Sequence, residues 1–223
     1  MNMTPYHRAC AGIVVVVVAL AVSACQTAYY GAMEKLGYEK RDILVDRVDD
    51  AREAQQEAKQ QFESALAQFI ATTNFSGGEL ERQYNKLKDA YDDSDSRAQA
   101  VRKRIDDVDR VAKDLFKEWD QELKQYTDPA LRRSSQTQLD ATKARYQKLI
   151  AVMRRAEKKL DPVLNAFRDR VLYLKHNLNA RAIASLRAER AKVEADIGAL
   201  VEDMNRSIRE ADAFIKEMAP AKK

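Results

Sequence analysis

The feature that most constrains this chain is an apolar repeat that advances in alternating steps of four and three residues. Steps of this kind place side chains on one face of an α-helix, and such a face must be buried against other helices. The repeat is longest over Leu80, Tyr84, Leu87, Tyr91, Ser94, Ala98, Val101, Ile105, Val108, Ala112, Leu115, Trp119, Glu122 and Tyr126. It predicts long helices that pack side by side in the manner of a coiled coil, with Trp119 in the core.

Residues that break helices are scarce, with six glycines and four prolines among 223 residues. Few turns are therefore expected, and sheets are not. Three stretches interrupt the repeats, "TTNFSGG", "YTDPAL" and "KHNLNARAI". They divide the chain into helices predicted over 40–72, 79–126, 129–176 and 180–218. Because short connections favour antiparallel neighbours, the predicted fold is all-α, an elongated antiparallel coiled-coil-like bundle of about four long helices.

The second interruption carries signals for the start of a helix. Thr127 or Asp128 can cap the next helix, and Pro129 suits its first position. Further on, Asp161 and Pro162 interrupt the hydrogen-bond ladder while the apolar spacing continues through them. A kink is therefore predicted there, and a domain boundary is not.

The third interruption is a slip in the phase of the repeat, because Ile183 follows Leu178 by five residues. Three polar residues, His176, Asn177 and Asn179, mark this place as a candidate polar turn, with Asn179 capping the fourth helix. The alternative is one continuous helix with a local irregularity. His176 is expected to satisfy backbone groups at the turn, since no serine motif accompanies it as a nucleophile.

Metal and cofactor sites are not expected. A di-iron bundle needs Glu-x-x-His pairs, but Tyr173 stands three residues before His176. Without residues 1–24 the chain has one histidine, His176, and one cysteine, Cys25, which are too few for a zinc site of four soft ligands. Neither a phosphate-binding loop nor a dinucleotide fingerprint is present. The sequence therefore predicts a protein without catalytic residues, metal or cofactor.

The N-terminal segment carries an uncharged apolar run over 9–24, which follows a short basic start. This run is shorter than the roughly 20 residues of a membrane-spanning helix. Its end, Val22-Ser23-Ala24-Cys25, resembles the lipobox of bacterial lipoproteins. The resemblance implies that Cys25 is acylated and becomes the first residue, and that Gln26 favours sorting to the outer membrane. An ordinary secretory signal or an uncleaved anchor is the alternative.

These observations divide the chain into four parts: a lipoprotein signal peptide (1–24), a lipidated N-terminus with a short tether (25–39), one helical bundle domain (40–218) and a C-terminal tail (219–223). The net charge of +4 comes from 39 basic and 35 acidic residues, so nucleic acid is not an expected partner.

Opposite charges gather in neighbouring parts of the chain. Acidic residues predominate over 106–122, and basic residues predominate over 131–155. An antiparallel hairpin folded near Asp128 would place the two stretches side by side, so the basic stretch is expected to face a partner helix. The alternative is contact with an anionic lipid or lipopolysaccharide surface through Lys143, Arg145, Lys148, Arg154 and Arg155.

Four segments, "MEKLGYEKRDILVDRVDDA", "LFKEWDQELKQY", "LRRSS" and "LKHNLNARAIASL", resemble a family of predicted Gram-negative lipoproteins, domain of unknown function 2959. The resemblance covers nearly all of the processed chain, and the last segment is its most specific part. It implies an envelope protein and supplies no activity, cofactor or catalytic residue.

The expected function is that of a structural or interaction protein, a helical scaffold on the periplasmic face of the outer membrane. It would be attached through acylated Cys25 and would bind an envelope protein whose identity the sequence does not give. The alternative is direct binding of lipopolysaccharide or peptidoglycan, through the basic stretch or through Lys222 and Lys223. Apolar seams of this length can close within one chain or between two, so a homo-oligomer is also an open alternative.

Overall fold

The computed structural model describes residues 40–218 of the chain. The chain divides into two compact units, Met1–Ile43 and Leu44–Lys223, and the second unit contains the helical bundle. The predictions made for 1–24, 25–39 and 219–223, among them the roles of Cys25 and Gln26, lie outside the described residues.

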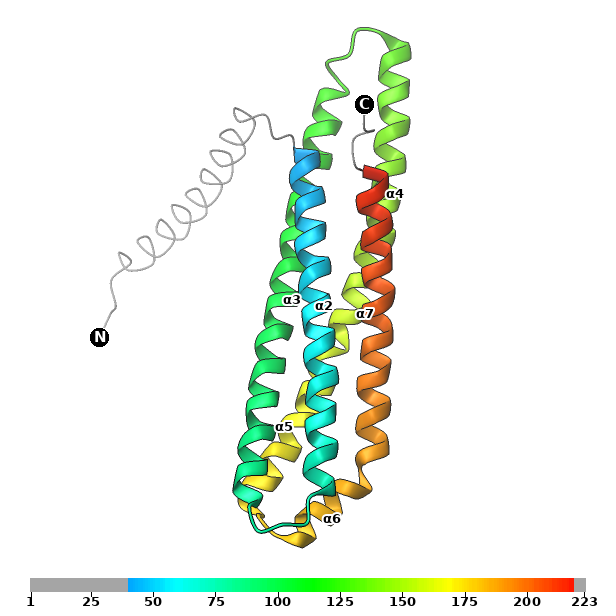
Figure 1. Ribbon diagram of the computed structural model, residues 1–223. Coiled ribbons are helices and arrows are strands. Elements are labelled where there is room, and N and C mark those ends of the chain that lie inside the picture. Colours follow the sequence, from blue (N-terminus) through cyan, green and yellow to red (C-terminus); the bar gives the residue numbers. More distant parts are fainter. Residues whose placement is uncertain (1–39, 219–223) are drawn as a thin grey trace, which may run out of the picture. The chain divides into compact units, whose positions relative to one another are not determined.

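The described residues form long helices and contain no strand. The helices are α2 (Lys40–Asn74), α3 (Leu80–Glu122), α4 (Pro129–Lys158), α5 (Leu160–His176), α6 (Ala180–Ala188) and α7 (Arg190–Met218). Single residues separate α4 from α5 and α6 from α7, so within Leu44–Lys223 the described helices make four rods. Neighbouring rods run antiparallel (Figure 1). The predicted all-α antiparallel bundle is confirmed.

The core of the bundle consists of the residues that the 4-and-3 spacing places on one face. In α2 all eight repeat positions are buried, namely Leu44, Val48, Ala51, Gln55, Ala58, Phe62, Ala65 and Phe69. The middle of α3 behaves in the same way, and Ile105 is fully enclosed. The repeat therefore builds one continuous seam, and burial of that seam stabilises helices that would be marginal in isolation.

The upper end of α3 differs from the prediction. The helix ends at Glu122, and the backbone N–H of Gln125 donates to the carbonyl of Glu122 at 2.9 Å in a tighter, three-residue turn. Tyr126, predicted on the seam, is 42% exposed. Trp119 is half-buried, and its Nε1 donates to Ser135 Oγ at 2.9 Å. The repeat thus continues in the sequence beyond the point where the chain must turn back.

Asp128 caps the N-terminus of α4. Of the two caps predicted, Thr127 and Asp128, the structure therefore has Asp128. Its Oδ1 accepts from the backbone N–H of Ala130 at 2.7 Å and of Leu131 at 3.3 Å. Pro129 occupies the first turn, where its missing N–H costs no hydrogen bond.

The predicted kink lies slightly before its predicted place. The helix is interrupted at Lys159, whose N–H bonds the carbonyl of Ala156 at 3.1 Å. Pro162 has no N–H to offer the carbonyl four residues earlier, so the interruption appears one turn ahead of the proline. A second interruption, at Glu189, was not predicted; there the N–H of Glu189 bonds the carbonyl of Leu186 at 3.1 Å.

Candidate functional site

A pocket lies between α5, α6 and α7, close to the turn at 177–179. It has a volume of about 570 Å³. Its lining residues are Ala166, Asp169, Arg170, Tyr173, Ser185, Leu186, Glu189 and Lys192. The three helices meet here because α6 is a short segment tilted away from α7 (Figure 1). The pocket therefore exists because the fourth rod breaks at Glu189.

Arg170 is the most unusual residue of this pocket, because it is charged and only 7% exposed. Its Nη2 lies 2.6 Å from Oε2 of Glu189, and its Nη1 donates to the carbonyl of Ala166. Its Nε is buried and has no hydrogen-bond partner among the described residues. A buried guanidinium N–H without a partner costs free energy, so the Nε of Arg170 can donate to a further polar group such as a water molecule or an anion.

A second, smaller cavity of about 10 Å³ adjoins the same side chain. Arg170 and Asp196 supply its charged groups, and apolar residues of α5 and α7 complete its wall. A space of this size with polar neighbours is close to the minimum for one water molecule.

The rim of the larger pocket carries both signs of charge, Lys192 against Asp169 and Glu189. Ser185 Oγ donates to the carbonyl of Arg181 at 3.1 Å and so acts within its own helix. The arrangement can hold a small polar or anionic group. It lacks a nucleophile paired with a base, and among the described residues there is no group of His, Cys, Asp and Glu that could hold a metal ion.

The predicted polar turn is confirmed as a turn in place of a continuous helix. Asn177 Nδ2 donates to the carbonyl of Tyr173 at 2.9 Å, and Asn179 Oδ1 accepts from the N–H of Ala182 at 3.0 Å as the cap of α6. The side chain of His176 is exposed and forms no hydrogen bond with the described residues, so its expected role at the backbone is not observed. The turn thus borders the pocket, and Tyr173 belongs to both.

Sequence reasoning did not single out Arg170. A signal was available, because Arg170 follows Phe167 by three residues and precedes Leu174 by four, which places a charge on the apolar face. A charge at such a position either pairs in the interior or lines a cavity, and Arg170 does both.

The five candidate anion-binding cations lie on α4, and each pairs with an acid of a neighbouring helix. The pairs are Lys143–Asp120 (2.9 Å), Arg145–Glu217 (2.7 Å), Lys148–Glu210 (2.8 Å), Arg154–Asp106 (2.7 Å) and Arg155–Asp203 (3.4 Å). Asp120 and Asp106 belong to α3, and the other three acids belong to α7. The geometry favours the interpretation in which the basic stretch serves the bundle.

Shifted pKa values occur where α3 and α4 meet and belong to this pairing. Tyr146 Oη donates to Asp109 Oδ1 at 2.6 Å. Burial and the Asp109 carboxylate raise the pKa of Tyr146 well above its ordinary value. Burial alone would raise the pKa of Asp109, but hydrogen bonds from Lys113 and Tyr146 lower it. Both groups thus keep their ordinary protonation states at neutral pH, as expected for a structural cluster.

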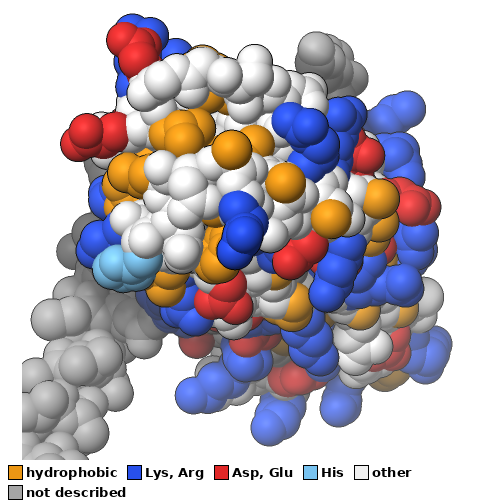
Figure 2. Space-filling model, turned by 90° about the horizontal axis from the view of Figure 1, so that it is seen from below, with side chains coloured by type: hydrophobic (Ala, Val, Ile, Leu, Met, Phe, Trp, Pro, Cys, Tyr) orange, Lys and Arg blue, Asp and Glu red, His pale blue; other side chains and the backbone are white. Residues whose placement is uncertain are grey.

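Exposed large hydrophobic side chains gather at two turns. Tyr126 and Leu131 flank the α3–α4 turn, while Leu172, Tyr173 and Leu178 flank the α5–α6 turn at the opposite end of the bundle. Figure 2 shows hydrophobic side chains at the surface of the lower end, with charged side chains of both signs around them. None of the helices in the described range is long and apolar enough to cross a membrane.

Comparison with known proteins gives one match. The profile of a family described as "Protein of unknown function (DUF2959)" matches residues 29–218. Neither a curated protein nor a solved structure matches the chain. The match covers the whole described bundle, including the pocket and both turns.

Proposed function

Because the chain belongs to the DUF2959 family, whose description assigns no function, we propose from its own residues that it is a lipid-anchored helical scaffold of the bacterial envelope. Acylation of Cys25 attaches it to a membrane, and Gln26 directs it to the periplasmic face of the outer membrane. It has no catalytic activity and needs no cofactor. It acts by binding another envelope protein.

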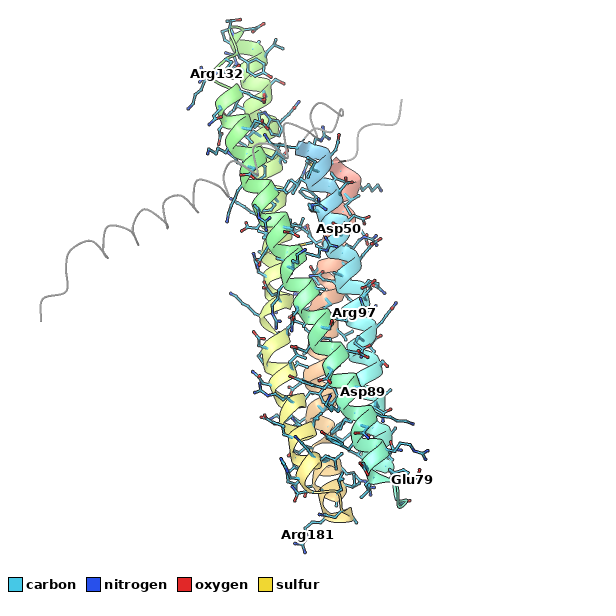
Figure 3. The ribbon with its side chains drawn as sticks, turned by 90° about the vertical axis from the view of Figure 1, so that its left-hand side faces the viewer. Asp50, Glu79, Asp89, Arg97, Arg132 and Arg181 are labelled. Atoms are coloured by element: carbon cyan, nitrogen blue, oxygen red, sulfur yellow. The ribbon has the colours of Figure 1, made fainter. Side chains whose placement is uncertain are left out.

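The observation that carries this proposal is the distribution of exposed side chains on the bundle. Along the shaft, charged residues pair between helices, as in Arg97 with Glu57 and Arg104 with Asp50. Figure 3 labels Arg97 and Asp50 on the shaft. The exposed large hydrophobic residues of the described range instead lie at the turns between helices. Because charged residues along the shaft pair with one another and apolar groups are exposed at the ends, the bundle is suited to bind a partner protein through its ends.

The second candidate function, direct binding of lipopolysaccharide or peptidoglycan by the basic stretch of α4, has weaker support. Its five cations already hold carboxylates of α3 and α7 at 2.7–3.4 Å. A polyanion would have to compete with those carboxylates for the same cations.

The experiment is crosslinking mass spectrometry on the protein in its native membrane. A photoreactive residue replaces Leu131 at the α3–α4 turn, and Ser64, exposed on α2, serves as the shaft control. We expect a defined protein to be captured from the turn position, in the wild type and not in Cys25→Ala. Crosslinks only within the chain, or equal capture from Ser64, would contradict the scaffold.

A further inference from the structure

We propose that the α5–α6 turn is a docking surface for an anionic phospholipid bilayer. The surface is named the α5–α6 tip and consists of Leu172, Tyr173, Lys175, His176, Leu178 and Arg181. The inference goes beyond the scaffold function, because it gives the end of the bundle its own membrane contact, separate from Cys25.

The charge pattern is the first argument. Between Asp169 and Glu189 the chain contains no acidic residue, although Asp and Glu make up 35 of its 223 residues. Lys175, His176 and Arg181 lie in this acid-free stretch, are exposed, and form no ion pair within the described range. Figure 3 shows Arg181 at the lower extremity of the bundle, pointing away from it.

The two acids that border this stretch do not neutralise the tip. Glu189 pairs with Arg170 at 2.6 Å, and Asp169 lies 4.0 Å from Arg168. At the same end of the bundle, Glu79 of the turn between α2 and α3 pairs with Arg82, so the α5–α6 tip keeps its positive charge and attracts an anionic surface.

Exposed apolar groups are the second argument. Leu172 is 47% exposed, and Tyr173 and Leu178 are each 41% exposed. They flank the cations, and the hydrogen bonds of Asn177 and Asn179 fix the turn that carries Leu178. Leucine and tyrosine side chains beside Lys and Arg are the composition of interfacial anchors, where the apolar groups enter the headgroup region and the cations meet phosphates.

The opposite end of the bundle supplies a contrast. The α3–α4 turn also exposes apolar groups, Tyr126 and Leu131, and unpaired cations, Lys124 and Arg132. Over 117–133, however, four Lys and Arg residues are balanced by four Asp and Glu residues, whereas 170–188 contains four Lys and Arg residues and no acid. The two ends therefore match in apolar exposure and differ in uncompensated charge, which makes the α3–α4 turn an internal control.

A bilayer is favoured over a protein partner because of the kind of contact available. The α5–α6 tip offers three separate apolar side chains beside cations that are unpaired within the described range, whereas the α3–α4 turn is the end left for the protein partner of the scaffold. A few apolar groups combined with cations are enough for reversible attachment to an anionic membrane.

The test uses the full chain, expressed with its lipid attached and carrying one environment-sensitive fluorophore at Ala180→Cys, with Cys10→Ser. Cys25 is retained, because its acylation masks the thiol and provides the N-terminal attachment. Ala180 is exposed beside the turn, so all three apolar residues are kept. The protein is reconstituted in phosphatidylcholine nanodiscs and titrated with vesicles of phosphatidylcholine alone or mixed with phosphatidylglycerol. A fluorophore at Ser64→Cys reports on the shaft, and co-elution with the nanodisc reports separately on the N-terminal attachment.

We expect a blue shift at position 180 with phosphatidylglycerol vesicles only, and none at position 64. Each cation contributes a factor of roughly 5, so the double variant Lys175→Gln/Arg181→Gln should raise the lipid concentration at half-response about 25-fold. The matched variant Lys124→Gln/Arg132→Gln should leave it within about twofold, and high salt should abolish the response.

Three results would overturn the proposal. One is an unchanged emission at position 180, and another is an equal response to neutral vesicles or in the matched variant. The third is a response to poly-glutamate as strong as the response to vesicles, which would assign the α5–α6 tip to an acidic protein partner. Loss of nanodisc co-elution with the tip response retained would instead count against the N-terminal anchor alone.

Discussion

Replacing Gln55 by leucine should stabilise this protein, which few single substitutions do. Gln55 lies on the seam of α2 and is fully buried. Neither its Oε1 nor its Nε2 has a hydrogen-bond partner within the described residues. A buried donor or acceptor left without a partner costs about 1–3 kcal/mol. Leucine has a similar volume and no polar atom, so the substitution removes that cost without opening a cavity.

The expected gain for Gln55→Leu is about 2 kcal/mol in the free energy of unfolding, the middle of the range for an unsatisfied buried group. For a chain of this size, that gain raises the melting temperature by about 4–8 °C. Reversible urea unfolding, followed by far-UV circular dichroism, measures it as a higher midpoint with an unchanged slope. Leucine and glutamine have similar helix propensities, so Gln60→Leu, at an exposed position of the same helix, should change little.

A loss of stability in Gln55→Leu would refute this reasoning, because it would mean that the buried amide is satisfied by a trapped water or by a second chain. Measuring the molar mass of both variants separates these causes. A polar residue in a coiled-coil seam can select the number of chains, so a change of mass on substitution would point to a homo-oligomer.

Other expectations concern the core, a cap and pH. Ile105→Asn should destabilise by about 3–5 kcal/mol, since a fully buried apolar side chain is lost and an amide without partners replaces it; unchanged thermal unfolding would show that the core is elsewhere. Asn179→Ala should cost about 1 kcal/mol by removing the cap of α6, while Asn179→Asp should retain most of it. Burial would raise the pKa of Asp203, but the Lys159 ammonium at 2.7 Å lowers it below its ordinary value. Such a carboxylate stabilises the fold above its unfolded pKa, and this contribution is lost as pH falls through the lower folded pKa. Asp203→Asn should therefore be less stable at neutral pH and lose less stability than wild type below about pH 4, as measured by urea unfolding; equal pH profiles would contradict the pairing.

The features predicted correctly from the sequence are those set by local geometry. The buried seam from Leu44 to Phe69 follows from 4-and-3 spacing alone, because that spacing fixes which side chains share a face of a helix. Asn179 was identified as a cap, and Asp128 as one of two candidates with Thr127, because a side-chain oxygen at the start of a helix can reach a backbone N–H two or three residues on.

The features that were missed depend on residues that are distant in sequence. Tyr126 continues the 4-and-3 repeat, yet it lies where the chain turns toward α4. The repeat itself contains no signal for the position of that turn. The pocket arises because Glu189 ends α6 and reaches Arg170 on α5, a contact between residues 19 positions apart. The assignments of Cys25 and Gln26 stay predictions, because they concern residues outside the described range.

The ion pairs between α4 and α7 have a mechanical consequence. Acidic residues recur on α7 every seven positions, at Asp196, Asp203, Glu210 and Glu217. Lys148 and Arg155, seven apart on α4, take two of them. If a pull along the bundle axis slid α7 by one heptad, about 10 Å, each of these cations would again face a carboxylate. These ion pairs thus resist separation of α4 and α7 far more than they resist sliding. The alignment of the two helices must therefore come from the connecting turns and the buried seam.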